Sequence, residues 1–402
     1  MKNLSLIIVL LVSFLSTNTQ VTDKSVQQKI SCIENGLIEV TSLAEMFDLD
    51  SAQLADRKTL TERMTALKVF GVSIVVVNNY QLEWAKAYGT ININSGVPVT
   101  TESYFEAAST SKLLTAVIVL YLVEKEKLSL DEDVNNYLKS WKVPENKFTK
   151  DEKVTLRRLL THQAGLPMTN FNYDENIGYP TLIDVLNGAL PALNKPAILE
   201  AIPGSRWMYS NVGYDVIQLL IEDVTGKPFA QAAEEIIFQP LEMNNSTFIY
   251  PLNEEQQKRE AFPHDEEGAC REPAMHLTAL AHGGLMTTPT DLAKFTVELM
   301  LSYKGKSGKI LSQQMTKQLV ARELDLDPNI LGTPVSEGLG CFINGEGKDL
   351  RFSHPGSNLP GANCWLMGFP ERGLGIFVMT NGAMGELLEL EIISAIVNEY
   401  SK

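Results

Sequence analysis

The chain has 402 residues, 44% of them hydrophobic, which is long enough for a large two-lobed enzyme or for two ordinary domains. It carries 34 basic and 49 acidic residues, a formal net charge of −15, and no cluster of Lys and Arg. This balance excludes a nucleic-acid-binding surface and disfavours an anionic membrane surface as a partner.

The N-terminus has the pattern of a secretory signal peptide, MKNLSLIIVLLVSFLSTNTQ. One Lys precedes an apolar stretch over residues 4–15, and small polar residues follow it. The stretch is too short for a bilayer span, which needs about 20 residues. We therefore predict a signal peptide at residues 1–19 and a secreted or periplasmic protein with no stable membrane span after cleavage. An uncleaved N-terminal anchor is the alternative.

Residues 20–58 show little periodicity and are predicted to form a loosely packed N-terminal arm. A short amphipathic helix follows in TLTERMTALKVF, because Leu60, Met64 and Leu67 fall on one face. Two strands joined by a tight turn at Asn78 and Asn79 are predicted in GVSIVVVNN and LEWAKAYG. A third extended piece, SYFEAA, leads directly into Ser109.

Residues from about 125 to 330 have a different pattern, with helical stretches separated by loops that contain Gly and Pro. Beyond them, short strands return in GLGCFING, DLRFSHPG, ANCWLMGFP and LGIFVMTNG, and a last helix follows in ELLELEIISAIVNEY. Strands at both ends with helices between them predict an α+β fold: one antiparallel sheet built from both termini, flanking helices and an inserted helical lobe.

Ser109 and Lys112 stand where an apolar run becomes helical, in FEAASTSKLLTAVIVLYLVE. Residues three apart lie on the same face of a helix, so the hydroxyl and the amine are within reach of each other. Burial among apolar residues lowers the pKa of a lysine, and a neutral amine can take the proton of a serine nucleophile. The alternative is a capping serine beside a surface lysine.

Two later stretches bear on that choice. Tyr209, Ser210 and Asn211 fall in a loop just before a helix, where the phenol and the amide can move protons and form hydrogen bonds. His354, Pro355 and Gly356 fall at the end of a predicted strand. Each stretch alone is a weak signal, and the YSN triplet is commonly a helix cap.

Taken together with LRRLLTHQAGLP and HGGLMTTPTDLAKF, the order and spacing of these motifs resemble the serine β-lactamase-like superfamily. The most similar branch comprises class C β-lactamases, DD-peptidases and family VIII esterases. The resemblance covers residues 59–400, which we take as one β-lactamase/transpeptidase-like serine hydrolase domain with a helical lobe at about 125–330.

The resemblance implies a role for seven residues. Ser109 would be the acylated nucleophile, Lys112 its base, and Tyr209 the group that passes protons to the leaving group and to the deacylating water. Asn211 would orient the substrate and Lys112, while His354 and Gly356 match the strand motif beside the cleft. The backbone N–H groups of Ser109 and Ser357 would form the oxyanion hole.

The third motif departs from the family pattern. Its middle residue is usually Thr or Ser, whose hydroxyl helps to hold a substrate carboxylate, but here it is Pro355, which has neither a hydroxyl nor an N–H. Its first residue is His354 in place of Lys, so a permanent positive charge is also missing. Both changes weaken the case for β-lactam or D-Ala-D-Ala substrates.

We therefore expect a secreted serine hydrolase, esterase-like or peptidase-like, that forms an acyl-enzyme with a small-molecule ester, amide or peptide. Whether the acyl group then passes to water or to another acceptor is left open. The alternative is a penicillin-binding type of protein that binds β-lactams or cell-wall peptides with little or no turnover. No metal or organic cofactor is implied. His162 is expected to be structural, and His264, His276 and His282 lack the spacing of metal ligands.

Overall fold

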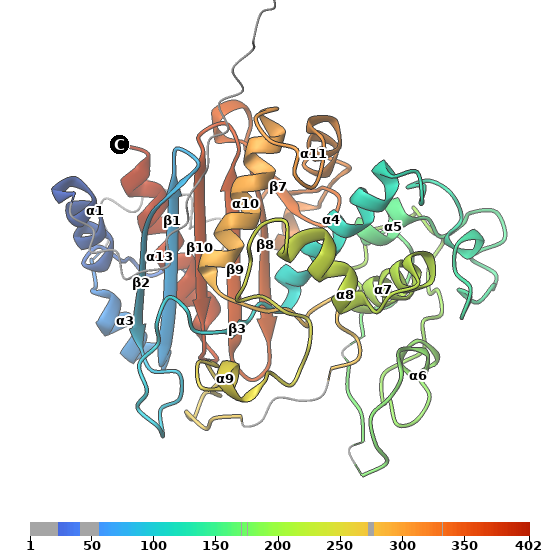
Figure 1. Ribbon diagram of the computed structural model, residues 1–402, viewed down its shortest axis with the longest axis horizontal. Helices are drawn as coiled ribbons and strands as arrows, with labels where there is room; N and C mark the ends of the chain where they lie inside the picture. Colours follow the sequence, from blue (N-terminus) through green and yellow to red (C-terminus); the bar gives the residue numbers. More distant parts are fainter. Residues whose placement is uncertain (1–22, 41–55, 170, 175, 272–276, 332) are drawn as a thin grey trace, which may run out of the picture.

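The computed structural model describes residues 23–40, 56–169, 171–174, 176–271, 277–331 and 333–402 (Figure 1). The predicted signal peptide at residues 1–19 lies outside these ranges. Among the described residues, no helix is both long enough and apolar enough to cross a bilayer.

An eight-stranded antiparallel sheet runs through the molecule in the order β2-β1-β10-β9-β8-β7-β6-β5 (Figure 1). Its strands are β1 (Gly71–Asn78), β2 (Gln81–Gly89), β5 (Leu324–Asp325), β6 (Ser336–Glu337), β7 (Phe342–Asn344), β8 (Arg351–Asn358), β9 (Ala362–Phe369) and β10 (Leu374–Thr380). N-terminal β1 pairs directly with C-terminal β10, so both ends of the chain build the sheet and the predicted α+β fold is confirmed.

The apolar strands are explained by burial on both faces of the sheet. In β1, Val72, Ile74 and Val76 belong to one hydrophobic core, whereas Val75 and Val77 belong to the other. Successive side chains of a strand point to opposite faces, so a strand covered on both sides needs an unbroken apolar run. The segment GVSIVVVN supplies such a run.

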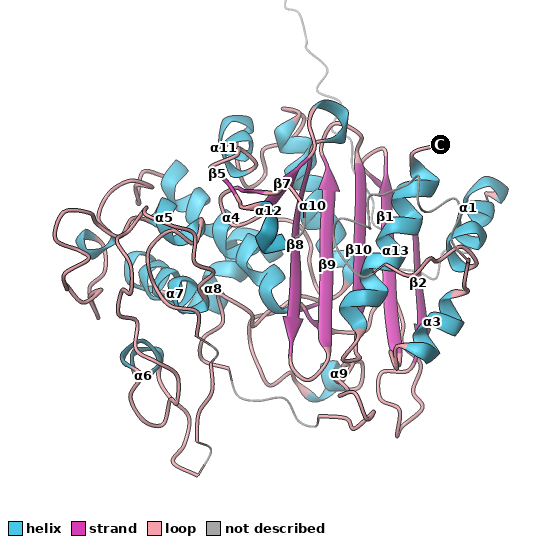
Figure 2. Cartoon of the chain, turned by 180° about the vertical axis from the view of Figure 1, so that it is seen from behind, coloured by secondary structure: helices cyan, strands magenta, loops and turns pink. Residues whose placement is uncertain are grey.

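Helices cover both faces of the sheet and build the lobe beside it. They are α1 (Lys24–Glu34), α3 (Leu60–Ala66), α4 (Ser111–Glu124), α5 (Leu156–Leu160), α6 (Leu182–Asn187), α7 (Asn211–Thr225), α8 (Phe229–Ala233), α9 (Glu254–Gln257), α10 (Pro289–Tyr303), α11 (Gln313–Leu319), α12 (Pro328–Leu331) and α13 (Gly385–Tyr400). Helix α10 lies on one face, while α13, with α1 and α3, lies on the other (Figure 2). Helices α4 to α8 form the lobe at the β5 end of the sheet (Figure 2).

Two segments differ from their predictions. In the arm predicted at residues 20–58, α1 is a packed helix that buries Val26, Ile30 and Ile33 and contacts α13. Helix α10 falls within the lobe predicted at about 125–330, but it packs on β1 and β10. The first difference is a helix that the prediction for the arm did not include. The second concerns which surface α10 covers, and local periodicity does not encode the partner of a helix. The domain limits themselves remain predictions.

Two local details of the structure also differ from the predictions made from the sequence. The β1–β2 turn is centred one residue later than predicted, on Asn79 and Tyr80, whose φ angles of 50° and 62° are those of a type I′ hairpin. The extended piece before Ser109 is only β3 (Phe105–Glu106), which pairs with β4 (Met286–Thr287) outside the main sheet. This small pair ties the start of the Ser109 segment to the segment before α10.

Candidate active site

Ser109 lies in a short 3₁₀ turn, η2 (Ala108–Thr110), directly before α4. Ala108 has φ 47°, the left-handed region that residues other than glycine rarely adopt. The Ser111 hydroxyl holds this turn by donating to Ala108 O at 2.6 Å and accepting from Leu285 N at 3.1 Å. The turn leaves Ser109 partly exposed while the next residues are buried.

Lys112 is fully buried one turn beyond Ser109. Its Nζ donates to Ser109 Oγ at 3.0 Å and to His282 O at 2.8 Å. Burial lowers the pKa of Lys112 to about 7, although the charges of Asp215 and Glu337 act in the opposite direction. The amine is therefore neutral in a large share of molecules near neutral pH, and the reading of Lys112 as a surface lysine is wrong.

Tyr209 reaches the same point from the loop before α7. Its ring centroid lies 4.9 Å from Lys112 Nζ. Burial raises the pKa of Tyr209, and a hydrogen bond with Ser109 opposes that rise. The neighbouring Ser210 caps α7 by accepting from Gly213 N at 3.0 Å, so the YSN triplet is both a helix cap and a part of the site.

His162 contacts the segment that carries Tyr209 through two hydrogen bonds and a ring contact. Its Nδ1 accepts from Ser210 N at 3.1 Å, its carbonyl accepts from Met208 N at 2.7 Å, and its ring lies 4.2 Å from that of Tyr209. Burial holds the pKa of His162 well below its usual range, which keeps the ring neutral and Nδ1 an acceptor. The structure thus gives His162 a positioning contact on each side of Tyr209.

The third motif lies within β8 and not at its end, because the strand continues to Asn358. Strand β7 pairs only with residues 351–353 of β8, so among the described strands residues 354–358 pair with β9 alone. That free edge faces η2, where Thr110 Oγ1 donates to His354 O at 3.0 Å. A Cβ atom on Gly356 would lie 2.2 Å from Ala107 O and 3.0 Å from Ser109 N, so only glycine permits this approach.

His354 does not replace the missing cation of the motif. Burial, with the charge of Lys112, lowers the pKa of His354 to about 3, so its ring is neutral at physiological pH. Its Nδ1 lies 2.7 Å from Pro355 O.

These groups line a cleft of about 770 Å³ between the sheet and the helical lobe. Six of the seven predicted site residues are part of its wall: Ser109, Tyr209, Asn211, His354, Gly356 and Ser357. Lys112 lies behind Ser109. Asn211 Oδ1 is buried and has no hydrogen-bond partner among the described residues.

Glu337 on β6 is a site residue that the sequence reading missed. Its carboxylate accepts from Trp207 Nε1 at 3.0 Å, and Trp207 lines the cleft next to Tyr209. Burial raises the pKa of Glu337 to about 8, while the bond from Trp207 and the charge of Lys112 lower it. No sequence signal distinguishes this residue from the other acidic residues, because its role depends on the contact with Trp207, which belongs to a distant segment of the chain.

Two further polar groups at the cleft were also missed. Arg271 forms an ion pair with Glu106, and Glu106 in turn accepts from Asn358 Nδ2 at 3.0 Å. His282, whose carbonyl binds Lys112, has its Nδ1 2.7 Å from Asp215 Oδ1. Among the described residues, no group of His, Cys, Asp or Glu is arranged to hold a metal ion, and His276 lies outside those residues.

Known proteins resemble this chain in sequence and in fold. Residues 57–392 match the model of the beta-lactamase family. The chain belongs to the beta-lactamase family. The predicted membership of the serine β-lactamase-like superfamily is therefore confirmed.

Two relatives of this chain are a staphylococcal protein and an esterase. Protein flp of Staphylococcus aureus (strain MRSA252) is 25% identical over 314 residues, 77% of this chain and 59% of that protein. Esterase EstB of Burkholderia gladioli is 30% identical over 214 residues, 50% of this chain and 54% of that protein. The chain thus spans less than two thirds of either relative.

Solved structures show the same fold. The octameric penicillin-binding protein homologue from Pyrococcus abyssi superposes with a TM-score of 0.69 at 25% identity, covering 82% of this chain and 74% of that one. A class C beta-lactamase superposes with a TM-score of 0.67 at 19% identity, covering 84% and 93%. The β-lactamase/transpeptidase-like fold is confirmed.

Proposed function

We propose that this chain is a serine hydrolase that acts on an ester or amide through an acyl-enzyme at Ser109. The observation that carries the proposal is the 3.0 Å contact between Ser109 Oγ and the buried Lys112 Nζ, whose pKa of about 7 makes it a base near neutral pH. Beta-lactamase-family relatives that include an esterase support acyl transfer as the general chemistry.

The groups present account for each proton in two steps. In acylation, Ser109 Oγ bonds to the substrate carbonyl carbon as its proton passes to neutral Lys112. The tetrahedral intermediate collapses by breaking the bond to the alcohol or amine, which leaves with a proton delivered through Tyr209. In deacylation, water attacks the acyl carbon and gives its proton to Tyr209 and Lys112. The bond between the acyl carbon and Ser109 Oγ then breaks, the acid leaves, and the proton returns to Oγ. Backbone N–H groups of Ser109 and Ser357 are proposed to bind the oxyanion.

Within this chemistry, esters without a carboxylate fit the cleft better than penicillins do. Pro355 has no donor, and His354 is neutral with a pKa of about 3, so the β8 edge offers no cation to a substrate carboxylate. Arg206 is exposed and does not line the cleft, while Arg271 lines it but pairs with Glu106.

Active-site labelling tests the proposal. A fluorophosphonate should form a covalent adduct with Ser109 in the wild type, detected by intact mass and peptide mapping. Ser109→Ala should abolish both the adduct and turnover of a nitrophenyl ester, by several orders of magnitude in rate. Ser95→Ala, in an exposed loop, is the matched control and should behave as wild type. Ester turnover by a folded Ser109→Ala variant would contradict the proposal.

The rival function is a binder of β-lactams or cell-wall peptides with little turnover. Its signature is stoichiometric labelling by a fluorescent penicillin that persists, together with no multiple turnover of any ester. The presence of Ser109, Lys112 and Tyr209 in one contact group favours the hydrolase, since a binder does not need Tyr209.

We also propose that the protein is secreted or periplasmic. The support is the sequence pattern of residues 1–19, and the test is the N-terminus of the mature protein recovered from expressing cells. Intact protein that starts at Met1 and stays with the membrane fraction would favour the uncleaved anchor instead.

A further inference from the structure

The cleft beside Ser109 has apolar groups on both its lobe side and its sheet side. Met168 and Phe171, in the loop after α5, line it from the lobe. Leu359, in the turn between β8 and β9, lines it from the sheet. Met168 is 54% exposed and Leu359 84% exposed, so a ligand between them would remove apolar surface from water on both sides.

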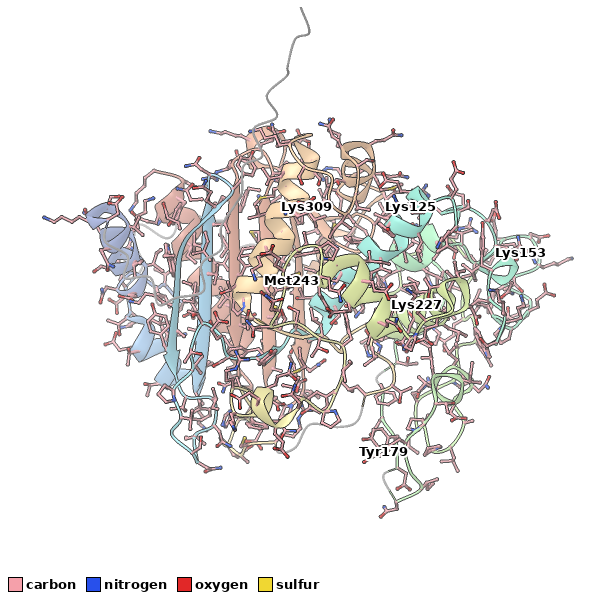
Figure 3. The ribbon with its side chains drawn as sticks, viewed as in Figure 1. Lys125, Lys153, Tyr179, Lys227, Met243 and Lys309 are labelled. Carbon is pink, nitrogen blue, oxygen red and sulfur yellow. The ribbon has the colours of Figure 1, made fainter. Side chains whose placement is uncertain are left out.

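Aromatic packing supports Phe171 on the lobe side of the cleft. Phe171 lies 5.5 Å from Tyr173, and Tyr173 lies 5.6 Å from Tyr179, which is at the far end of the lobe (Figure 3). Phe171 also packs on a small buried cluster of Val185, Ala192 and Ala279. Phe171 is therefore held by packing against Tyr173 and this cluster.

The charges in the cleft do not favour an anionic ligand. Arg271, the one Arg or Lys of the described cleft wall, pairs with Glu106 and donates to Leu359 O at 2.9 Å. The other acidic groups of that wall are Glu386 and Glu389, and burial raises the pKa of Glu389 well above its usual range. A ligand that fills this space is best neutral and apolar apart from its reacting carbonyl.

We propose that Met168, Phe171 and Leu359 form a subsite for an aliphatic chain, so that the preferred substrates are neutral esters bearing a chain of roughly six to ten carbons. This rests on the proposed hydrolase function and names its substrate class. The cleft volume of about 770 Å³ is large for an acetyl group but falls in the range of sites that enclose a whole small molecule.

Chain-length series test the subsite directly. With nitrophenyl esters from acetate to decanoate, kept below their micelle concentrations, kcat/KM should rise roughly two- to fourfold per methylene until the chain leaves the cleft. A second series, acetate esters of alcohols of increasing length, shows whether the chain belongs to the acyl or the alcohol part. A rise in either series supports the subsite, and flat profiles in both overturn it.

Exposed wall residues permit variants that do not disturb the core. Met168→Ser and Leu359→Ser should each reduce the ratio of octanoate to acetate kcat/KM by about threefold or more. Ile249→Ser and Leu190→Ser are matched controls, since these side chains are 67% and 65% exposed and lie outside the cleft wall; they should keep the wild-type ratio. An unchanged ratio in both cleft variants overturns the proposal.

Labelling separates failure of the subsite from failure of the proposed function. Two fluorophosphonates, one with a short and one with a long alkyl chain, should both label Ser109, the long one at least about tenfold faster. Equal rates with complete labelling overturn the subsite and leave the hydrolase intact. Absence of labelling by either probe overturns both.

Discussion

The indole N–H of Trp207 donates to the buried carboxylate of Glu337 at 3.0 Å, across 130 residues of sequence, and joins the cleft wall to strand β6. Lys112 and Glu337 are both fully buried, with a lowered and a raised pKa respectively. Because an ionised Glu337 favours the charged form of Lys112, the two groups compete for one proton near neutral pH.

Glu337→Gln should therefore shift the acid limb of the pH–kcat/KM profile to lower pH. The amide oxygen of Gln can still accept from Trp207, but the ionised fraction of Glu337, whose negative charge raises the pKa of Lys112, is gone. The base becomes neutral at lower pH, and because Glu337 is only partly ionised near neutral pH, a shift of roughly a few tenths of a pH unit is expected.

Glu323→Gln is the matched control, because Glu323 lies next to β6 but pairs with Arg157 outside the cleft wall. Its profile should superpose on that of the wild type. If Glu337→Gln also leaves the acid limb in place, the carboxylate is structural only.

Lys112→Arg should reduce kcat/KM by about 10²-fold or more while the protein stays folded. Arginine keeps a positive charge but does not lose its proton, so it cannot take the proton of Ser109. In the wild type, activity should rise with pH through the Lys112 pKa of about 7, because the base is the deprotonated form.

The comparison is Lys125→Arg, an exposed position just beyond α4 (Figure 3). It should retain both the wild-type rate and the wild-type pH profile. Near-normal ester turnover by Lys112→Arg would rule out the general-base role.

Gly356→Ala should reduce esterase activity by roughly 10²-fold or more, because misplacing the reacting groups by about 1 Å is that costly. The added methyl group would lie 2.2 Å from Ala107 O, so β8 must move away from η2 and from Ser109. Gly308→Ala meets only Leu311 O at 3.8 Å and should be neutral. Wild-type kcat/KM in Gly356→Ala would show that the β8 edge does not position the nucleophile.

Pro355→Thr should improve acylation by penicillin relative to ester hydrolysis, by about tenfold to a hundredfold in the ratio of rates. Threonine adds a hydroxyl and an N–H at the point where the family motif usually holds a substrate carboxylate, and His354, with its pKa of about 3, supplies no charge there. Efficient penicillin hydrolysis by the wild type would instead show that another donor already holds the carboxylate.

Much of the site could be predicted from sequence because its parts are local patterns. Ser109 and Lys112 are one helical turn apart, and Tyr209 and Asn211 flank the cap of α7. The family resemblance then linked these stretches to β8. By contrast, nothing near Glu337, Arg271 or Met168 in the sequence marks them as cleft residues, since each reaches the site through a contact with a distant segment.

The sequence by itself determined the two-faced apolar strands, the amphipathic helices and the three motifs, because backbone periodicity and helical spacing are set by neighbouring residues. Only the tertiary structure decided that α1 packs on α13 and α10 on β1 and β10, that β8 has a free edge beside Ser109, and that Glu337 accepts a hydrogen bond from Trp207. These relationships depend on strand register and on which surfaces bury each other. Both are settled by the packing of segments far apart in the chain, so no local pattern contains them.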